Sequence, residues 1–153
     1  MPGKRVRDSA AVLAQVMTPQ DANPAGSVHG GLIMKLIDEA GGVVAYRHAR
    51  SNVATVSLGR LDFHSAVRVG NLLSLKSCIH RVGTSSIDVG VRVEAEDLLT
   101  GEVRHAATAY LTYVALDEKG RPRAVPPLIL ETEEDVRRNA AAKARRAKRA
   151  VRR

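Results

Sequence analysis

The chain has 153 residues, of which 44% are hydrophobic, so it is long enough for one domain with a substantial core. It contains no Trp, one Phe and three Tyr, which leaves Val, Leu, Ile and Ala to build that core and disfavours a protein that stacks nucleic-acid bases on aromatic rings. The formal net charge is +8, but residues 137–153 hold nine Lys and Arg and no acid, which leaves 15 basic and 16 acidic side chains elsewhere. The basic character therefore belongs to the tail and not to the predicted domain.

The N-terminus resembles a secretion signal only superficially. Three basic residues precede the apolar run 10–16, but that run is short, contains Gln15 and is not followed by a cleavage pattern. No apolar stretch approaches the roughly 20 residues of a membrane helix. The single cysteine, Cys78, has no partner for an intramolecular disulfide and is interpreted as a buried, unreactive thiol. We therefore expect a cytoplasmic protein.

The pattern predicts a strand, a long helix and then four more strands. Residues 12–17 are predicted to be a short first strand or an extended lead-in, and Pro24 and Gly26 keep residues 19–28 in an irregular loop. From Gly30 to about His48, apolar positions recur at three- and four-residue spacing, which predicts a helix. These positions are Ile33, Ile37, Ala40, Gly41 and Val44. The four further strands are 53–63, 72–82, 86–96 and 103–116, joined by turn sequences.

The strand at 86–96 alternates most clearly. Ile87, Val89, Val91 and Val93 lie on one face, and Asp88, Gly90, Arg92 and Glu94 lie on the other. This predicts an α+β fold in which the sheet has one covered and one wetter face. One helix covers one face only, and a symmetric dimer that pairs edge strands would protect the open edges.

The C-terminal segment is a predicted helix. From Glu131 the sequence is rich in Ala, Lys and Arg, with acids at the start and bases at the end, as the helix dipole favours. It has no apolar stripe wide enough to require docking. We therefore divide the chain into an N-terminal extension (1–9), a domain (10–130) and a basic C-terminal helix (131–153).

Asp38 is the first candidate for chemistry. It shares a helical stripe with Gly31, Lys35 and Gly42, two turns inside the predicted helix. A helix start offers unpaired N–H groups to a carbonyl oxygen that gains negative charge, and a carboxylate on the same face can act as base or nucleophile. Glu39 points about 100° away, so a shared-proton pair is not expected. The pair Gly41-Gly42 indicates either close approach of a ligand or backbone, or tight packing on the sheet.

Other candidate residues carry weaker signals. His29 lies beside the helix start, where the dipole opposes its protonation, so a structural hydrogen bond competes with a chemical role. The remaining histidines and Cys78 have no metal-site spacing, and no metal is predicted. Residues 82–86 form a hairpin turn or, with their hydroxyls and N–H groups, a contact for a phosphate or pantetheine amide.

Six segments stand out in the same order along the chain: NPAGSVHGG (23–31), KLIDEAG (35–41), DFH (62–64), VG (69–70), GTSS (83–86) and YVALDEKGRPRAVPP (113–127). Together they resemble the hotdog-fold acyl-CoA thioesterases, and in particular their cytosolic acyl-CoA hydrolase branch. The resemblance covers roughly residues 10–135, with the motifs in the same order. One departure is that Glu39-Ala40-Gly41-Gly42 stands where some bacterial relatives have an apolar residue and glycines, which leaves the acyl chain length open.

The resemblance implies a long central helix wrapped by an antiparallel sheet, and a homodimer with active sites at its interface, assembled as a trimer of dimers. It implies that Asp38 is the general base or nucleophile, that Asn23 of the partner subunit orients water or substrate, and that the backbone at Gly30 and Gly31 polarises the thioester carbonyl. Substrate and coenzyme A contacts are assigned to His29, Gly30, Arg81, Gly83, Thr84, Ser85 and Ser86. No metal or redox cofactor is implied, since coenzyme A is part of the substrate and product.

The predicted function is therefore hydrolysis of acyl-CoA to free acid and CoA. An alternative is a non-catalytic acyl-CoA-binding or sensing module whose basic tail contacts nucleic acid or an anionic membrane, although a tail that merely solubilises the protein is favoured. A dehydratase acting on hydroxyacyl thioesters would need a placed histidine, and His29 is a poor match.

Overall fold

The elements follow the predicted order. The computed structural model describes residues 1–151, in which strand β2 (Ala11–Val16) leads through a loop into helix α1 (Gly30–Ala49). Four strands and a second helix follow: β3 (Asn52–Phe63), β4 (Leu72–Val82), β5 (Ser86–Glu96), β6 (Val103–Leu116) and α2 (Glu133–Val151). Short elements complete the chain: β1 (Lys4–Arg5), β7 (Leu128–Ile129) and the 3₁₀ helices η1 (Val6–Asp8) and η2 (Pro19–Asp21).

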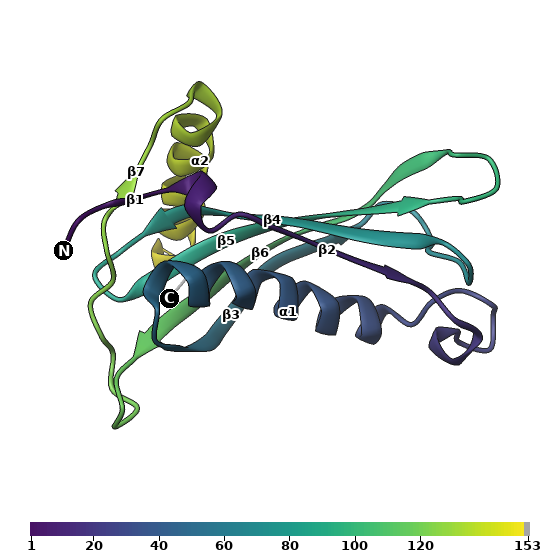
Figure 1. The fold of residues 1–153 in the computed structure, drawn as a ribbon, viewed down its shortest axis with the longest axis horizontal. Coiled ribbons are helices and arrows are strands. Elements are labelled where there is room, and N and C mark those ends of the chain that lie inside the picture. Colours follow the sequence, from purple (N-terminus) through teal and green to yellow (C-terminus); the bar gives the residue numbers. More distant parts are fainter. Residues whose placement is uncertain (152–153) are drawn as a thin grey trace.

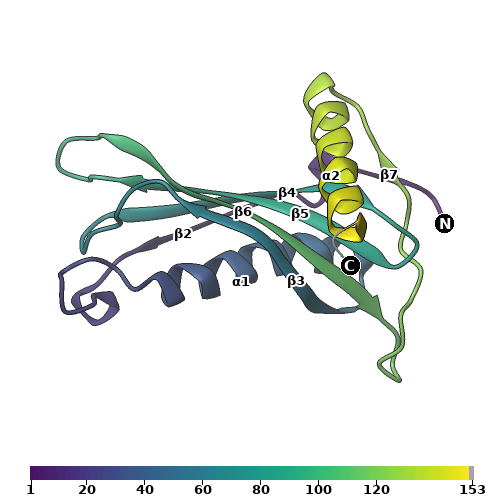
Figure 2. The ribbon, with the colours of Figure 1, turned by 180° about the vertical axis from the view of Figure 1, so that it is seen from behind.

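The main sheet has five antiparallel strands in the order β2-β4-β5-β6-β3. Figures 1 and 2 show α1 along one face of this sheet and α2 across the opposite face. Strand β3 is an edge strand, paired only with β6 among the described residues. A long helix held against an antiparallel sheet is the hotdog arrangement, so the expected fold is confirmed.

Helix α1 buries the predicted stripe. The five predicted positions of the stripe, from Ile33 to Val44, are buried, and Leu36, Ala45 and His48 join them against the inner face of the sheet. The stripe around Asp38 is exposed or half-buried. The helix ends at Ala49, and the following C-cap residue, Arg50, has a left-handed backbone (φ 51°) and donates its N–H to the carbonyl of Tyr46.

The sequence pattern missed two short strands, of which β1 binds the C-terminal end of α1 through Lys4. Strands β1 and β7 pair in parallel over two residues each, too few to show a period. Lys4 on β1 donates to the carbonyls of Arg47 (3.3 Å) and His48 (2.8 Å), which satisfies acceptors at the helix end. Nε2 of the buried His48 lies 2.7 Å from the carbonyl oxygen of Pro126.

The prediction of one covered and one wetter sheet face is only partly right. Ile87, Val89, Val91 and Val93 are buried under α1 as expected. On the other face Arg92 is exposed, but Asp88 and Gly90 are buried. The cause is α2, which covers this end of the outer face (Figure 2).

The prediction that the basic C-terminal helix needs no docking surface is therefore wrong. Ala142 is buried (3% exposed), and the amide of Asn139 donates to the carbonyl of His80 at 3.0 Å. The guanidinium of Arg145 lies 3.7 Å from the centroid of the Tyr110 ring, and that of Arg149 donates to Oγ of Ser57 at 3.0 Å. Small alanines permit close approach, and arginine side chains cover apolar surface with their stems while their charged ends bind polar groups.

Candidate active site

Asp38 is held by two strands of the sheet. Its Oδ1 accepts a hydrogen bond from Oγ1 of Thr55 (2.7 Å), and the hydroxyl of Tyr113 lies 3.2 Å from the same oxygen. The single proton of the Tyr113 hydroxyl is shared with the main-chain oxygen of Asp38, which lies 2.9 Å away. Thr55 on β3 and Tyr113 on β6 are direct cross-strand partners. The sheet register therefore delivers two hydroxyl donors to one carboxylate on α1.

Tyr113 is the largest fully buried side chain of the core. Burial, followed by the charge of Asp38 and the hydrogen bond to it, raises the pKa of the Tyr113 phenol above its ordinary value. The hydroxyl therefore keeps its proton at neutral pH and acts as a donor.

Gly41 provides the space for this hydroxyl. A Cβ at Gly41 would lie 2.5 Å from the Tyr113 oxygen, closer than packed atoms approach. At Gly42 the nearest atom to a Cβ would be 4.0 Å away, an ordinary contact. Of the two interpretations of the glycine pair, packing on the sheet applies at Gly41 within this chain.

The start of α1 offers two free backbone donors. The N–H groups of Leu32 and Ile33 donate to the carbonyl of His29, whereas those of Gly30 and Gly31 have no partner among residues 1–151. A Cβ at Gly31 would meet no atom within 4 Å, and one at Gly30 would meet only Phe63 at 3.7 Å. His29 is the exposed N-cap residue, and its side chain makes no capping hydrogen bond. The helix start is thus open to an acceptor from outside the chain.

Asn23 organises the loop that precedes this helix start. Its Oδ1 accepts from the N–H groups of Ala25 (3.0 Å) and Ser27 (3.2 Å), which leaves the side-chain amide nitrogen as its outward donor. No hydrogen bond joins Asn23 to Asp38 within the described chain.

A pocket adjoins the helix start. It has a volume of about 320 Å³ and lies beside Gly30. Ile33, Phe63 and Val67 supply apolar walls, and Ser27 and Ser65 supply hydroxyls. Its lining suits the apolar part of a ligand whose polar group reaches the free N–H groups.

The β4–β5 turn with the predicted coenzyme A contacts is tied into the fold. The carbonyl of Thr84 accepts from the N–H of Val125 (2.8 Å), and that of Ser85 accepts from Ala115 (2.9 Å). Gly83 is half-buried, and a Cβ there would lie 2.5 Å from Oγ of the buried Ser86. The hydroxyl of Thr84 is therefore the most accessible of the group, because Thr84 is exposed.

Arg81 is engaged inside the chain. Its guanidinium pairs with the buried carboxylate of Asp88 at 3.3 Å. A pocket of about 410 Å³ opens beside the turn, lined by Arg81, Gly83 and Lys143 among others. An anion in this pocket would meet positive charge from both β4 and α2.

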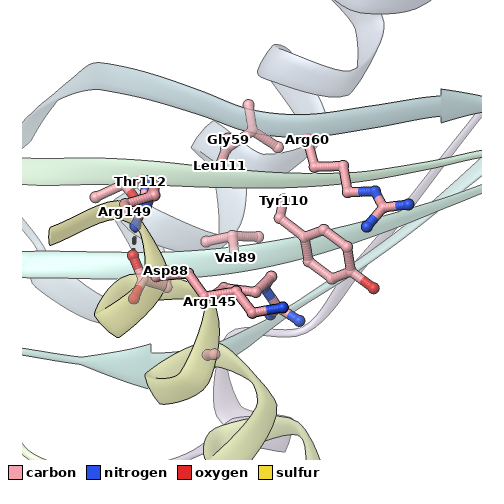
Figure 3. A pocket seen from close by; sticks show the side chains of 11 residues that line it. Gly59, Arg60, Asp88, Val89, Tyr110, Leu111, Thr112, Arg145 and Arg149 are labelled. Carbon is pink, nitrogen blue, oxygen red and sulfur yellow. Dashed lines mark hydrogen bonds between the residues drawn. The ribbon is translucent and has the colours of Figure 1, made fainter. Parts of the chain in front are cut away.

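A different pocket lies on the opposite face of the sheet from Asp38. It has a volume of about 220 Å³ between α2 and strands β3, β5 and β6 (Figure 3). Tyr110, Arg145 and Arg149 line it, and Asp88 accepts a hydrogen bond from Thr112 at its floor (2.7 Å). The sheet separates this pocket from the candidate active site.

Two residues of the site escaped sequence reasoning, namely Thr55 and Tyr113. Neither stands in a spacing that points to Asp38, because the sheet register brings them there. Among the described residues, no group of three or more His, Cys, Asp or Glu side chains could hold a metal ion. None of the described helices is both long and apolar enough to cross a membrane.

Comparison with known proteins matches residues 25–102 to the family model of the thioesterase superfamily. The chain is 35% identical over 132 residues to the cytosolic acyl coenzyme A thioester hydrolase of Mus musculus, which covers 85% of this chain and 35% of the mouse protein. The chain thus spans about a third of the length of that relative. It is 38% identical over 130 residues to an uncharacterized acyl-CoA thioester hydrolase of Bacillus subtilis, covering 85% of this chain and 76% of that protein.

Solved structures agree with these matches. An apo-hexameric acyl-CoA thioesterase superposes with a TM-score of 0.96 at 36% identity, covering 99% of this chain and 97% of the other. An acyl-CoA hydrolase of Staphylococcus aureus, solved with butyryl coenzyme A and coenzyme A, gives a TM-score of 0.91 at 32% identity and coverages of 99% and 92%. Alanine variants of that hydrolase at one aspartate, one asparagine and one threonine are also solved. The chain belongs to the thioesterase superfamily, and its fold is the hotdog fold.

Proposed function

We propose that the protein hydrolyses acyl-CoA thioesters to a carboxylic acid and coenzyme A. The observation that carries the proposal is the carboxylate of Asp38, bound through Oδ1 by Thr55 and Tyr113, on the same helix as two free N–H groups at its start. The relatives named as acyl-CoA thioester hydrolases and the S. aureus neighbour with bound butyryl coenzyme A support the substrate class.

In the proposed reaction the thioester carbonyl oxygen accepts hydrogen bonds from the backbone N–H groups at Gly30 and Gly31 of a partner subunit, because the seven-residue separation of Gly31 from Asp38 along α1 places them about 10 Å apart within one chain. These donors stabilise the negative charge that develops on the oxygen. Asp38 removes a proton from water, whose oxygen attacks the carbonyl carbon, or attacks that carbon itself and is then released by water. The carbon–sulfur bond breaks, and the coenzyme A thiolate takes up a proton.

We propose that Asn23 acts on the Asp38 site of a partner subunit. Within one chain Asn23 does not contact Asp38, while its amide nitrogen remains available as a donor. Strand β3 carries Thr55 and is an edge strand, with Val56 and Leu58 exposed by 55% and 38%. A second copy paired along β3 would therefore lie next to Asp38. The hexameric state of neighbours supports a trimer of such dimers.

We propose further that the nucleotide part of coenzyme A contacts the β4–β5 turn. The exposed Thr84, with Gly83, Ser85 and Ser86, would offer hydroxyls, and the pocket with Arg81 and Lys143 would offer positive charge to a phosphate. The ion pair with Asp88 engages one nitrogen of the Arg81 guanidinium and leaves its other N–H groups available to a phosphate.

The alternative of a binding module with a nucleic-acid- or membrane-contacting tail has less support. Arg145, Arg146 and Arg149 of α2 are engaged with the sheet, through Tyr110, Asp88 and Ser57 respectively. This use of the basic residues favours a structural role for α2.

The test is release of coenzyme A thiol from acyl-CoAs of increasing chain length, by the wild type and by Asp38→Asn. We expect turnover by the wild type and a loss of at least about a hundredfold in the variant. Glu39→Gln is the matched control, because Glu39 is the exposed neighbour on the same helix. Full activity of Asp38→Asn would disprove the assignment, and coenzyme A binding without turnover by the wild type would favour the binding module.

Mixing subunits tests the shared site. Asn23→Ala and Asp38→Asn should each be inactive, whereas their mixed dimer would contain one site with both native residues. Co-expression should restore up to about a quarter of the activity, if subunits pair at random. If a verified mixed dimer shows no activity, Asn23 and Asp38 of the same subunit form the site.

A further inference from the structure

Tyr113 carries a hydroxyl that packing alone does not require. Its ring is 1% exposed in the core between β6 and α1, where a phenylalanine ring would fill the same space. A buried hydroxyl is unfavourable unless it is hydrogen-bonded, and this one is bonded only to Asp38 within the described chain.

The two donors to Asp38 meet the same carboxylate oxygen. Thr55 and Tyr113 both reach Oδ1, while no described residue donates to Oδ2. An aspartate side chain turns freely about its terminal torsion unless its oxygens are held. Thr55 and Tyr113 hold Oδ1 from different strands, with the single Tyr113 proton shared between Oδ1 and the main-chain oxygen of Asp38, and this restricts the torsion and distinguishes the two carboxylate oxygens.

Gly41 completes the arrangement. It lies one turn after Asp38 on the buried face of α1, where alanine would be the better helix former. A Cβ there would be 2.5 Å from the Tyr113 oxygen and 3.2 Å from two of its ring carbons. The clash is thus worst at the hydroxyl.

We propose that Tyr113 is a positioning residue of the hydrolase site, which holds Oδ1 of Asp38 together with Thr55 so that Oδ2 acts on water or on the thioester. This inference rests on the proposed role of Asp38 as the reacting carboxylate. The raised pKa of the buried phenol keeps Tyr113 a donor throughout the neutral range.

The first test is Tyr113→Phe, which removes the hydroxyl and keeps the ring. We expect kcat to fall about tenfold with little change in KM, since a hydrogen bond to a charged group is lost without a substrate contact. Tyr110→Phe is the matched control on the same strand, since Tyr110 lies on the outer face and should leave both unchanged.

The second test is a double-mutant cycle with Gly41→Ala. In the wild type, the added methyl should displace the Tyr113 hydroxyl and lower kcat about tenfold or more. In the Tyr113→Phe background, the most crowded atom is gone, and the same substitution should lower kcat much less. Thermal unfolding of each variant establishes that the compared proteins are folded.

The outcomes separate this inference from the proposed function. If Asp38→Asn is inactive but Tyr113→Phe keeps the wild-type kcat, the positioning role is overturned and the hydrolase proposal stands. A change in KM alone, or additive effects in the cycle, also overturns it. If Asp38→Asn retains activity, both proposals fail together.

Discussion

A single methyl group at Gly90 should loosen the contact between the sheet and α2. A Cβ on Gly90 would overlap Cε1 and Nε2 of the His80 ring and lie 3.1 Å from its Nδ1. His80 is buried, its carbonyl accepts from Asn139, and its Nδ1 lies 3.4 Å from the Arg145 guanidinium. The ring is therefore enclosed between β5 and α2 and cannot move aside without disturbing the helix.

The magnitude follows from overpacking. Adding one carbon to a packed site costs about 1–3 kcal/mol, and since the ring is held from both sides we expect about 2 kcal/mol for Gly90→Ala. In a chain of this size the melting temperature should then fall by roughly 4–8 °C. Thermal unfolding at a fixed protein concentration measures this, because oligomerisation makes Tm depend on concentration.

The control for this prediction is the same substitution in His80→Ala. With the imidazole absent, the methyl at position 90 has room, and Gly90→Ala should cost less than about 0.5 kcal/mol. Equal destabilisation in both backgrounds would refute the reasoning, because the loss would then arise from the strand backbone and not from the His80 contact.

Two further predictions concern titration and the edge strand. Burial, with the charges of Arg138 and Arg145, lowers the pKa of His80 to about 4. The neutral ring therefore makes its full contribution to stability above about pH 6.5. As the pH falls toward 4, the unfolded chain takes up the proton first, and the free energy of unfolding falls by about 3 kcal/mol in all. Denaturant unfolding between pH 7 and 4.5 should show a shallower loss in His80→Ala than in the wild type, and parallel curves would count against it. Thr55→Val removes the other donor to Asp38 while keeping the side-chain shape, so kcat should fall about tenfold with an unchanged melting temperature; an unchanged kcat would show that this hydroxyl is dispensable.

The sequence predicted the long elements because their periods are strong. The burial of the helix positions Ile33, Ile37 and Val44 and of alternate strand positions from Ile87 to Val93 followed directly from spacings near 3.6 and 2. Docking of α2 could not be predicted in this way. Its contacts with the sheet are made by alanines and arginine side chains, and a hydrophobicity pattern predicts such residues to be exposed. Strands β1 and β7 have two residues each and leave no periodic signal.

Only the part of the candidate site that lies within one segment of the sequence was predicted. Asp38 and the helix start lie within one segment, so their common face could be inferred from helical spacing. Thr55 and Tyr113 lie 17 and 75 residues away from Asp38 in sequence, and only the register of β3 with β6 brings both to it. The choice between packing and ligand contact at Gly41 likewise depended on knowing where Tyr113 points.

Two consecutive residues of strand β6 face the two helices, one on each side of the sheet. Thr112 donates to Asp88 on the outer face under α2, and Tyr113 donates to Asp38 on the inner face at α1. Because side chains alternate along a strand, a substitution on one face leaves the other face intact unless the strand itself shifts. Gly90→Ala should therefore lower the melting temperature but leave kcat unchanged when activity is measured at a moderate temperature. Tyr113→Phe should lower kcat and leave the outer face unchanged. Loss of kcat in a folded outer-face variant would mean that docking of α2 fixes the position of β6 and, through Tyr113, that of the Asp38 carboxylate.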